Sequence, residues 1–306
     1  MNTNPMICDL KTGVCGVGEE DEHTQIIDFN PQPQPKVTLY YATDPICSHC
    51  WAIEPTLNRF IQQYGKYFHL QPLMGGLLAG WNGFADKANG IQQPADVAGH
   101  WKEVGAHYRM PIDGSLWLNN PVMSSYPPSR VFKVIQQRHP GKELAYLRSA
   151  REAVFVFNRN IGEDEVLTDI VDSLGLPGDE IIQAAGLEAA QELLEEDFQK
   201  VAQLGVRGFP TLVMINEENQ GIKLVGSRTL QNYVDALQQL IPEPLTPAAL
   251  PAMPELLAEG HLLFSREIEA MYDIGQDEVE AFTAAALPGQ SYRTRQILGE
   301  MFIEPA

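Results

Sequence analysis

Basic residues are scarce in this sequence. Its 306 residues include 21 lysines and arginines against 40 aspartates and glutamates, which gives a formal net charge of −19. Nucleic-acid backbones and anionic membrane surfaces both attract positively charged proteins and repel acidic ones. We therefore expect neither a nucleic acid nor a membrane among the partners of this protein.

Long apolar runs are missing as well. No stretch approaches the roughly 18 continuous apolar residues that mark a membrane-spanning helix. The first residues contain no basic start followed by an apolar core, so the sequence predicts no secretory signal. We expect a cytoplasmic protein, and in that compartment cysteine pairs are more often catalytic or metal-bound than structural.

Cysteine is rare and clustered. Only four occur, all in the first sixth of the chain: Cys8, Cys15, Cys47 and Cys50. Four are too few for a disulfide-stapled framework. The first two lie in residues 1–35, a predicted flexible arm with six acids, one base and a proline-rich end. Cys8 and Cys15 are candidates for a metal site with His23, for a disulfide, or for electron exchange with the second pair. Two idle thiols are an equal alternative.

A strand, a helix and a second strand are predicted over residues 36–74. The β-branched and aromatic residues of 36–44 are typical of a buried strand. Apolar residues at 3.6-residue spacing predict a helix over 47–65, which Pro55 should kink after two turns. Residues 67–74 predict the second strand. The second cysteine pair therefore lies where the first strand meets the helix of a βαβ unit.

Helical patterns dominate from about 75 to 204. Five helices are predicted, over residues 94–109, 127–139, 143–158, 163–175 and 187–205. Two apolar runs within 211–226 then predict a β-hairpin, and 228–241 predicts an amphipathic helix. Sheet-forming segments thus flank a helical insertion.

The C-terminal part is predicted to be separate. Residues 242–254 are proline-rich and typical of a linker. Beyond it, 255–306 predicts a small module with two helices and a possible strand pair, in the manner of a winged helix. From residue 243 onward there are 11 acids and three arginines. This excess argues against DNA binding and favours a docking or packing role.

The stretch "CSHCW" has the chemistry of a redox dithiol. A thiolate is the nucleophile in disulfide exchange, and the N-terminus of a helix stabilises one at Cys47. Cys50, one turn later, is placed to attack the mixed disulfide that Cys47 forms. Protonated His49 is expected to lower the pKa of Cys47 further, and Trp51 to cover one side of the pair. The alternative is half of a zinc site, which needs two further ligands.

Pro210 strengthens the redox interpretation. It lies in "RGFPTLV", directly before an apolar strand. A cis bond between Phe209 and Pro210 would present backbone groups to the dithiol. A proline that merely opens a strand is common, but its combination with the cysteine pair is far less common by chance.

This layout resembles the DsbA-like branch of the thioredoxin fold, in which a helical domain separates the CxxC half from the cis-proline half. The stretches "DPICSHCW", "GGLLAG", "MPIDGSLWLNNP", "SSYPPSRVF" and "RGFPTL" are most similar to its cytosolic FrnE type and to SpxH (YjbH) adaptors, over residues 36–241. The resemblance implies an α/β thioredoxin fold with a large helical insertion and, here, a small mainly helical C-terminal appendage.

The resemblance also implies roles for individual residues. Cys47 is the attacking cysteine, Cys50 resolves, and Pro210 is the cis-proline. The substrate-binding candidates beside His49 and the thiols are Trp51, Phe209 and Thr211.

Carboxylates near the dithiol are placed differently from those of many relatives. Tyr41 occupies the strand position where such relatives keep a carboxylate. Asp44 is expected to order the loop, and Glu54 to face solvent.

Two functions follow as alternatives. The first is an enzyme, a cytoplasmic thiol–disulfide oxidoreductase or isomerase. It would act on protein or small-thiol substrates and need no cofactor beyond the redox-active Cys47–Cys50 disulfide. The second is an adaptor that presents a regulator to a ClpXP-type protease, with the acidic C-terminal module as docking surface and the cysteines secondary. Glutathione-linked isomerases of the same superfamily are a weaker third alternative, because they do not need Cys50.

Overall fold

The described residues of this computed structural model are 7–9, 14–16, 36–86, 89–258, 262–287 and 292–305. Residues 1–34 and 35–306 form two units. In the first unit, strands β1 (Ile7–Asp9) and β2 (Val14–Gly16) pair antiparallel, with Cys8 opposite Cys15 in the register. His23 lies outside the described residues.

Four strands form the central sheet of the second unit, in the order β4-β3-β5-β6. Their bounds are β3 (Val37–Thr43), β4 (Phe68–Met74), β5 (Thr211–Asn216) and β6 (Gly221–Val225). Strand β3 runs parallel to β4 and antiparallel to β5. The predicted strands and hairpin are confirmed, and the apolar β3 lies in the middle of the sheet, where both of its edges are paired.

One face of the sheet is covered by helices that precede and follow the helical insertion in the chain. These elements are α1 (Ser48–Ala52), α2 (Glu54–Tyr64), the short η1 (Gly65–Tyr67) and α10 (Leu230–Leu240). Phe60 of α2 and Tyr233 of α10 pack with Leu39 of β3 in one apolar cluster. The helix predicted over 47–65 is interrupted at Ile53, and Pro55 lies in the first turn of the new helix, where its missing N–H leaves no hydrogen bond unmade.

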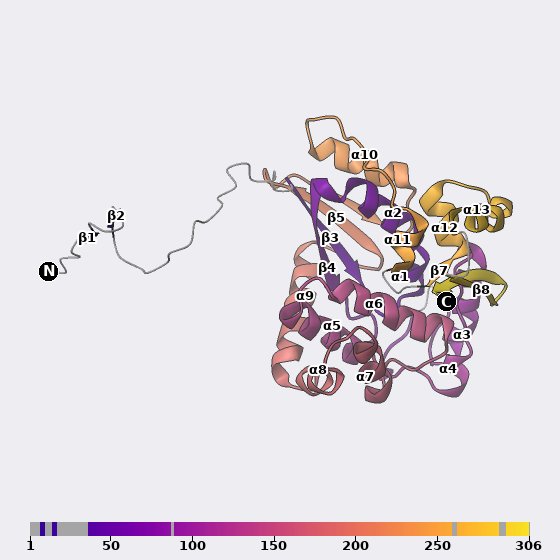
Figure 1. Cartoon of the computed structure of the whole chain (residues 1–306). Helices are drawn as coiled ribbons and strands as arrows, with labels where there is room; N and C mark the ends of the chain where they lie inside the picture. The colour runs from indigo at the N-terminus through magenta and orange to yellow at the C-terminus, as the bar shows by residue number, and fades with distance from the viewer. Residues whose placement is uncertain are drawn as a thin grey trace. The chain divides into compact units, whose positions relative to one another are not determined.

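The helical insertion covers the other face (Figure 1). It comprises α3 (Asp96–Tyr108), α4 (Leu116–Asn119), α5 (Tyr126–Arg138), α6 (Glu143–Arg151), η2 (Glu152–Val156), α7 (Asp164–Ser173), α8 (Gly178–Ala185) and α9 (Glu188–Gln203). The five predicted helices are confirmed, although the third ends in the π-helical turn η2. Val201 of α9 packs against Ala42 and Leu73 and so seats the insertion on the sheet.

The C-terminal module combines three helices with a three-stranded sheet of order β7-β9-β8. Its elements are α11 (Met253–Ala258), β7 (Leu263–Phe264), α12 (Ser265–Tyr272), η3 (Gln276–Glu278), α13 (Val279–Ala286), β8 (Tyr292–Ile297) and β9 (Glu300–Pro305). Helix α11 begins inside the proline-rich stretch, and strand β7 was not predicted. The domain boundaries given above remain our proposal.

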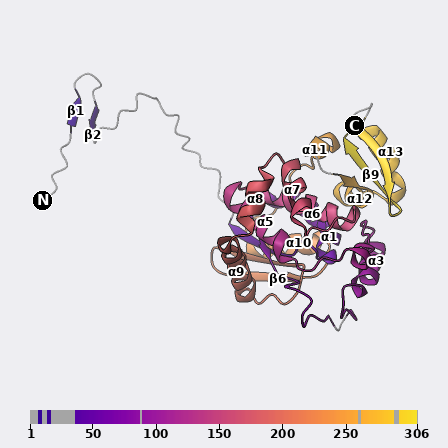
Figure 2. The same cartoon turned by 90° about the horizontal axis from the view of Figure 1, so that it is seen from below.

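The module packs against the thioredoxin part of the chain. Phe264 and Phe302 are buried in the same large apolar cluster as Trp51. Arg109, at the end of α3, pairs with Glu269 at 2.8 Å and with Glu300 at 3.1 Å. Figure 2 shows the module, in yellow, next to α3. In the described part of the chain, no helix is long and apolar enough to cross a membrane.

Candidate active site

The two cysteines lie where β3 gives way to α1. Cys47 caps α1: its sulfur accepts a hydrogen bond from the N–H of Cys50 at 3.2 Å, and its own N–H donates to the Asp44 carbonyl at 3.2 Å. Both thiols are free. Cys47 is 6% exposed and Cys50 is 0% exposed, so a partner meets Cys47 first.

The electrostatics of the pair differ from the prediction. Burial raises the pKa of Cys47 well above its ordinary value, and the hydrogen bond and negative charge of Cys50 raise it further. Burial also raises the pKa of Cys50, but the hydrogen bond from Cys47 and the positive charge of Arg151 outweigh it, so that pKa is lowered. The expectation that Cys47 holds the lowered pKa is therefore wrong. Within the pair, the directions of the two pKa shifts favour the thiolate at Cys50.

His49 does not supply the expected positive charge. Its ring lies 5.5 Å from that of His100 and 6.0 Å from that of Tyr108, centroid to centroid. Burial lowers the pKa of His49, and the charges of His100 and His107 lower it further. The imidazole is therefore mostly neutral at neutral pH, and its predicted effect on Cys47 is not supported.

The Phe209–Pro210 bond is cis, as the sequence pattern predicted. In the sheet register Thr211 pairs with Ala42, which places Pro210 beside the end of β3, where the dithiol loop begins. The half-buried ring of Phe209 lies against Gly75, where a Cβ would come within 2.0 Å of it. The two motifs, 160 residues apart in sequence, thus meet at one edge of the sheet.

Two substrate-binding candidates are buried. Trp51 is 0% exposed; its indole N–H donates to the Pro111 carbonyl at 3.1 Å, and its ring stacks on Phe155. The Thr211 hydroxyl donates to the Gly208 carbonyl at 2.7 Å and fastens the loop before β5. Neither side chain is exposed, and a part for Trp51 or Thr211 in substrate binding stays a prediction. Phe209 remains a candidate.

Asp44 orders the dithiol loop, as predicted. One carboxylate oxygen accepts the N–H of Ile46 at 3.1 Å, and the other accepts the N–H of Leu77 and the hydroxyl of Ser125, both at 2.8 Å. The side chain is fully buried, and burial raises its pKa from 3.8 to about 6 in spite of these donors.

Glu54 is buried rather than solvent-facing. It pairs with Arg151 at 2.6 Å and with Arg148 at 3.0 Å. Helices α6 and α12 cover this side of α2, and their approach cannot be read from the spacing within α2. The prediction that Glu54 faces solvent is therefore wrong.

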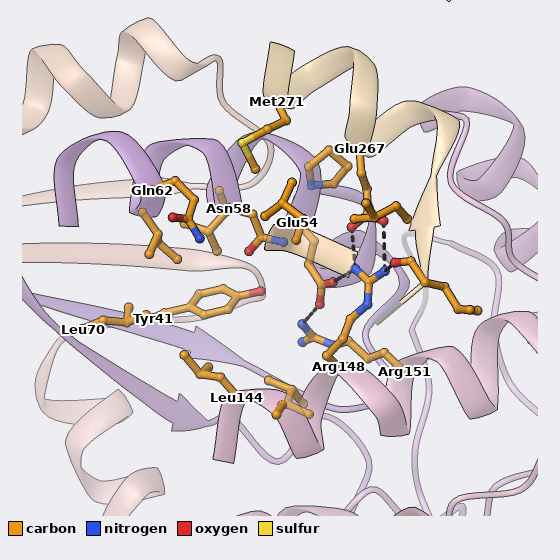
Figure 3. Close-up of a pocket in the computed structure, with 18 of the residues that line it drawn as sticks. Tyr41, Glu54, Asn58, Gln62, Leu70, Leu144, Arg148, Arg151, Glu267 and Met271 are labelled. Atoms are coloured by element: carbon orange, nitrogen blue, oxygen red, sulfur yellow. Dashed lines mark hydrogen bonds and ion pairs between the residues drawn. The ribbon is translucent and has the colours of Figure 1, made fainter. Parts of the chain in front are cut away.

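A cavity of about 570 Å³ opens above these ion pairs, between α2, α6 and α12 (Figure 3). Leu144 and Met271 line it on opposite sides and Tyr41 lies across it, while Asn58 and Gln62 add polar groups to the lining. The Tyr41 hydroxyl donates to the Cys50 carbonyl at 3.4 Å. Tyr41 and Arg151 thus line the cavity and also contact the elements that carry the dithiol.

Arg151 is the residue that the sequence patterns did not reveal. The only signal was a charged residue on the apolar side of the helix predicted over 143–158.

Among the residues that the structure describes, no three histidine, cysteine, aspartate or glutamate side chains lie close enough together to hold a metal ion. In the predicted Cys8–Cys15–His23 set, His23 lies outside those residues, so that site stays untested.

The sequence also matches that of known proteins. A family model described as thioredoxin matches residues 40–235. The chain belongs to the thioredoxin family. Within this family it is similar to the ClpXP adapter protein SpxH of Halalkalibacterium halodurans, with 29% identity over 282 residues, 90% of each chain. The protein of the same name from Bacillus subtilis is 26% identical over 252 residues, 81% of this chain and 82% of the relative.

Solved thioredoxin-family structures share the fold. A putative protein disulfide isomerase from Nitrosomonas europaea has a TM-score of 0.56 at 23% identity and covers 67% of this chain and 95% of its own. The cytosolic disulfide reductase DsbM from Pseudomonas aeruginosa has a TM-score of 0.51 at 22% identity, covering 61% and 88%. The fold is DsbA-like, with the helical insertion that the sequence predicted.

Proposed function

We propose that the protein exchanges disulfides with protein thiols through Cys47 and Cys50. The supporting observation is the arrangement of Cys47, the more exposed of the two sulfurs, hydrogen-bonded to a fully buried Cys50, next to the cis Phe209–Pro210 bond. This arrangement offers one sulfur to a partner and keeps the second within reach of the first.

The reaction in the reducing direction needs only these two residues and a protein disulfide. Transfer of one proton from Cys47 to the Cys50 thiolate makes Cys47 the nucleophile. Its thiolate attacks one sulfur of the substrate, the substrate S–S bond breaks, and the other sulfur leaves as a thiolate. Cys50 then passes its proton to the substrate thiolate that has left and attacks the mixed disulfide, which releases the second substrate thiolate and forms the Cys47–Cys50 disulfide.

Two electrons pass from the dithiol to the substrate in this sequence. A small thiol such as glutathione restores the dithiol and is itself oxidised to a disulfide. We propose no cofactor beyond the redox-active pair, and we propose the cytoplasm as the place of the reaction.

The test is catalysed reduction of insulin disulfides by a thiol. Wild type is expected to accelerate the reaction, and Cys47→Ser to reduce the rate to the uncatalysed one, because the attacking sulfur is gone. Cys50→Ser is expected to accumulate mixed disulfides with the substrate, since nothing resolves them. Undiminished turnover by Cys47→Ser would exclude this function.

A second candidate is an adaptor for a ClpXP-type protease. The observation that favours it is coverage: the SpxH relative matches 90% of this chain, whereas the oxidoreductase structures cover 67% and 61%. The match to the adaptor therefore extends over more of this chain than the match to the oxidoreductases, which favours a C-terminal module shared with the adaptors. Under this proposal the partner is a regulatory protein that the module and groove present to the protease.

The adaptor proposal is tested with the double variant Cys47→Ser, Cys50→Ser. It requires that this variant still captures a cellular protein and still accelerates that protein's degradation by the ClpXP protease of the same organism. Capture that depends on both cysteines would instead support exchange through a mixed disulfide.

A further inference from the structure

A buried arginine lies beneath the dithiol. Arg151, the last residue of α6, is 1% exposed. Its guanidinium donates to the Thr43 hydroxyl at 2.5 Å and to the Asp44 carbonyl at 3.1 Å. These two residues end β3 and begin the loop that carries the cysteines. A charge buried this deeply costs several kcal/mol unless it is paired and hydrogen-bonded, so its position is specific.

Thr43 connects the arginine to Cys50. A guanidinium only donates hydrogen bonds, so the Thr43 oxygen accepts from Arg151 and its single O–H is left to donate. Both the Thr43 side chain and the charge of Arg151 lower the pKa of the Cys50 thiol against the effect of burial. A fixed cation and a fixed donor thus act on the same sulfur.

We infer that Arg151 is a positioning residue for the dithiol: it fixes Thr43 and the Asp44 carbonyl, where the loop of the cysteines begins, and stabilises the thiolate form of the pair by its charge. This inference rests on the proposed disulfide exchange and concerns how that site is tuned. The reduced form of the pair contains the thiolate, so Arg151 favours the dithiol over the disulfide and makes the disulfide a stronger oxidant.

Glu54 sets how much of this charge the dithiol experiences. Its carboxylate lies between two cations, at 2.6 Å from Arg151 and 3.0 Å from Arg148 (Figure 3). Arg148 also bonds Glu267 of α12 in the C-terminal module, at 2.9 Å. Neutralising Glu54 leaves more net positive charge near the cysteines, so it should act in the direction opposite to neutralising Arg151.

Other titratable groups also face the pair. Tyr41 approaches from β3, Asp44 from the loop and His49 from α1. They are the same in every variant proposed below, so a difference between variants reports on the Arg151–Glu54 pair.

The experiment measures the redox equilibrium of the dithiol with glutathione. Two glutathione thiols reduce the Cys47–Cys50 disulfide to the dithiol and become glutathione disulfide, and the reduced fraction is read by alkylation and mass. At about pH 8.5, near the ordinary pKa of a cysteine thiol, Arg151→Met should decrease the equilibrium constant for reduction roughly tenfold, equal to one unit of pKa. Glu54→Gln should increase it by about threefold.

Two further variants keep the test decisive. Thr43→Val, of nearly the same shape, removes only the hydroxyl and should decrease the constant by about threefold, which decides the case if Arg151→Met does not fold. The matched control is Glu269→Gln. Glu269 is 5% exposed on the same helix as Glu267, but it pairs with Arg109 instead of joining the Glu54 network. This control should leave the constant unchanged.

The outcomes separate this inference from the proposed function. Constants within twofold of wild type for Arg151→Met and Glu54→Gln, or shifts in the same direction, would overturn the role of Arg151. Because the equilibrium needs no protein substrate, it is measurable even if wild type fails to reduce insulin. Such a failure would reject the proposed exchange with proteins and leave the tuning of the dithiol to be decided by the four variants.

Discussion

At the scale of single residues, Asp44 and Glu54 are both buried next to the dithiol, but only Glu54 has direct cationic partners. Asp44 is satisfied by two backbone N–H groups and one hydroxyl. Uncharged donors stabilise a carboxylate less than an arginine does. Burial therefore dominates at Asp44 and raises its pKa to about 6.

Asp44 should make the protein's stability depend on pH. The folded state holds the proton more tightly than the unfolded state, whose pKa is near 3.8. The contribution is therefore most favourable below pH 3.8 and is lost as the pH rises to about 6, by on the order of 3 kcal/mol at 1.36 kcal/mol per unit.

The measurement is the free energy of unfolding of wild type and Asp44→Asn by urea from about pH 4 to pH 7. The difference between them, wild type minus variant, should fall over this range, because the amide does not titrate. A constant difference would show that the carboxyl titrates normally in the folded protein.

At the scale of elements, the end of β4 and the loop before β5 depend on each other. The Gly75 N–H donates to the Thr43 carbonyl at 2.7 Å, and the ring of Phe209 occupies the space where a side chain at 75 would be. The residue that follows β4 therefore fixes the cis-proline loop against the end of β3.

Gly75→Ala should displace Phe209 and slow disulfide exchange. The added Cβ lies 2.0 Å from the ring, and overpacking of this kind costs about 1–3 kcal/mol. The measurements are insulin reduction and thermal unfolding. The control is Gly99→Ala in α3, where nothing lies within 4 Å and alanine should stabilise the helix by about 0.5–1 kcal/mol. An unchanged exchange rate in Gly75→Ala would mean that the loop tolerates a moved Phe209.

The elements were predictable where local patterns are strong. The apolar run of β3 and five helices of the insertion were predicted, whereas α8 was not, and α4, with four residues, and the two-residue β7 are too short to show a period. The site was predictable at the cysteines and Pro210, whose chemistry is visible in the sequence. Arg151 was not, because its contact with Thr43 spans 108 positions and depends on how the insertion packs.

At the scale of the whole molecule, the C-terminal module shares a core with the thioredoxin domain. Phe264, in the module, is 0% exposed and meets Trp51 edge to face with 5.7 Å between ring centroids. The guanidinium of Arg148 lies 4.7 Å from the same indole ring. Trp51, which belongs to the helix that carries the dithiol, therefore packs directly against a module that begins about 200 residues later.

Phe264→Ala should destabilise the whole of residues 35–306 instead of releasing the module alone. Loss of a buried phenylalanine costs about 3–5 kcal/mol, and the shared core should keep unfolding in one transition. Calorimetry and tryptophan fluorescence would be followed together during heating. Two separate transitions would instead show that the module unfolds independently.

The origin of Arg151 in the helical insertion has a consequence for protein engineering. A minimal scaffold made only from the sheet-forming halves would keep Cys47, Cys50 and Pro210. It would remove the guanidinium that binds the Thr43 hydroxyl and the Asp44 carbonyl, and expose the underside of the active-site loop to water. Transplanting this chemistry into another host therefore requires that helix α6 be carried along with the cysteines.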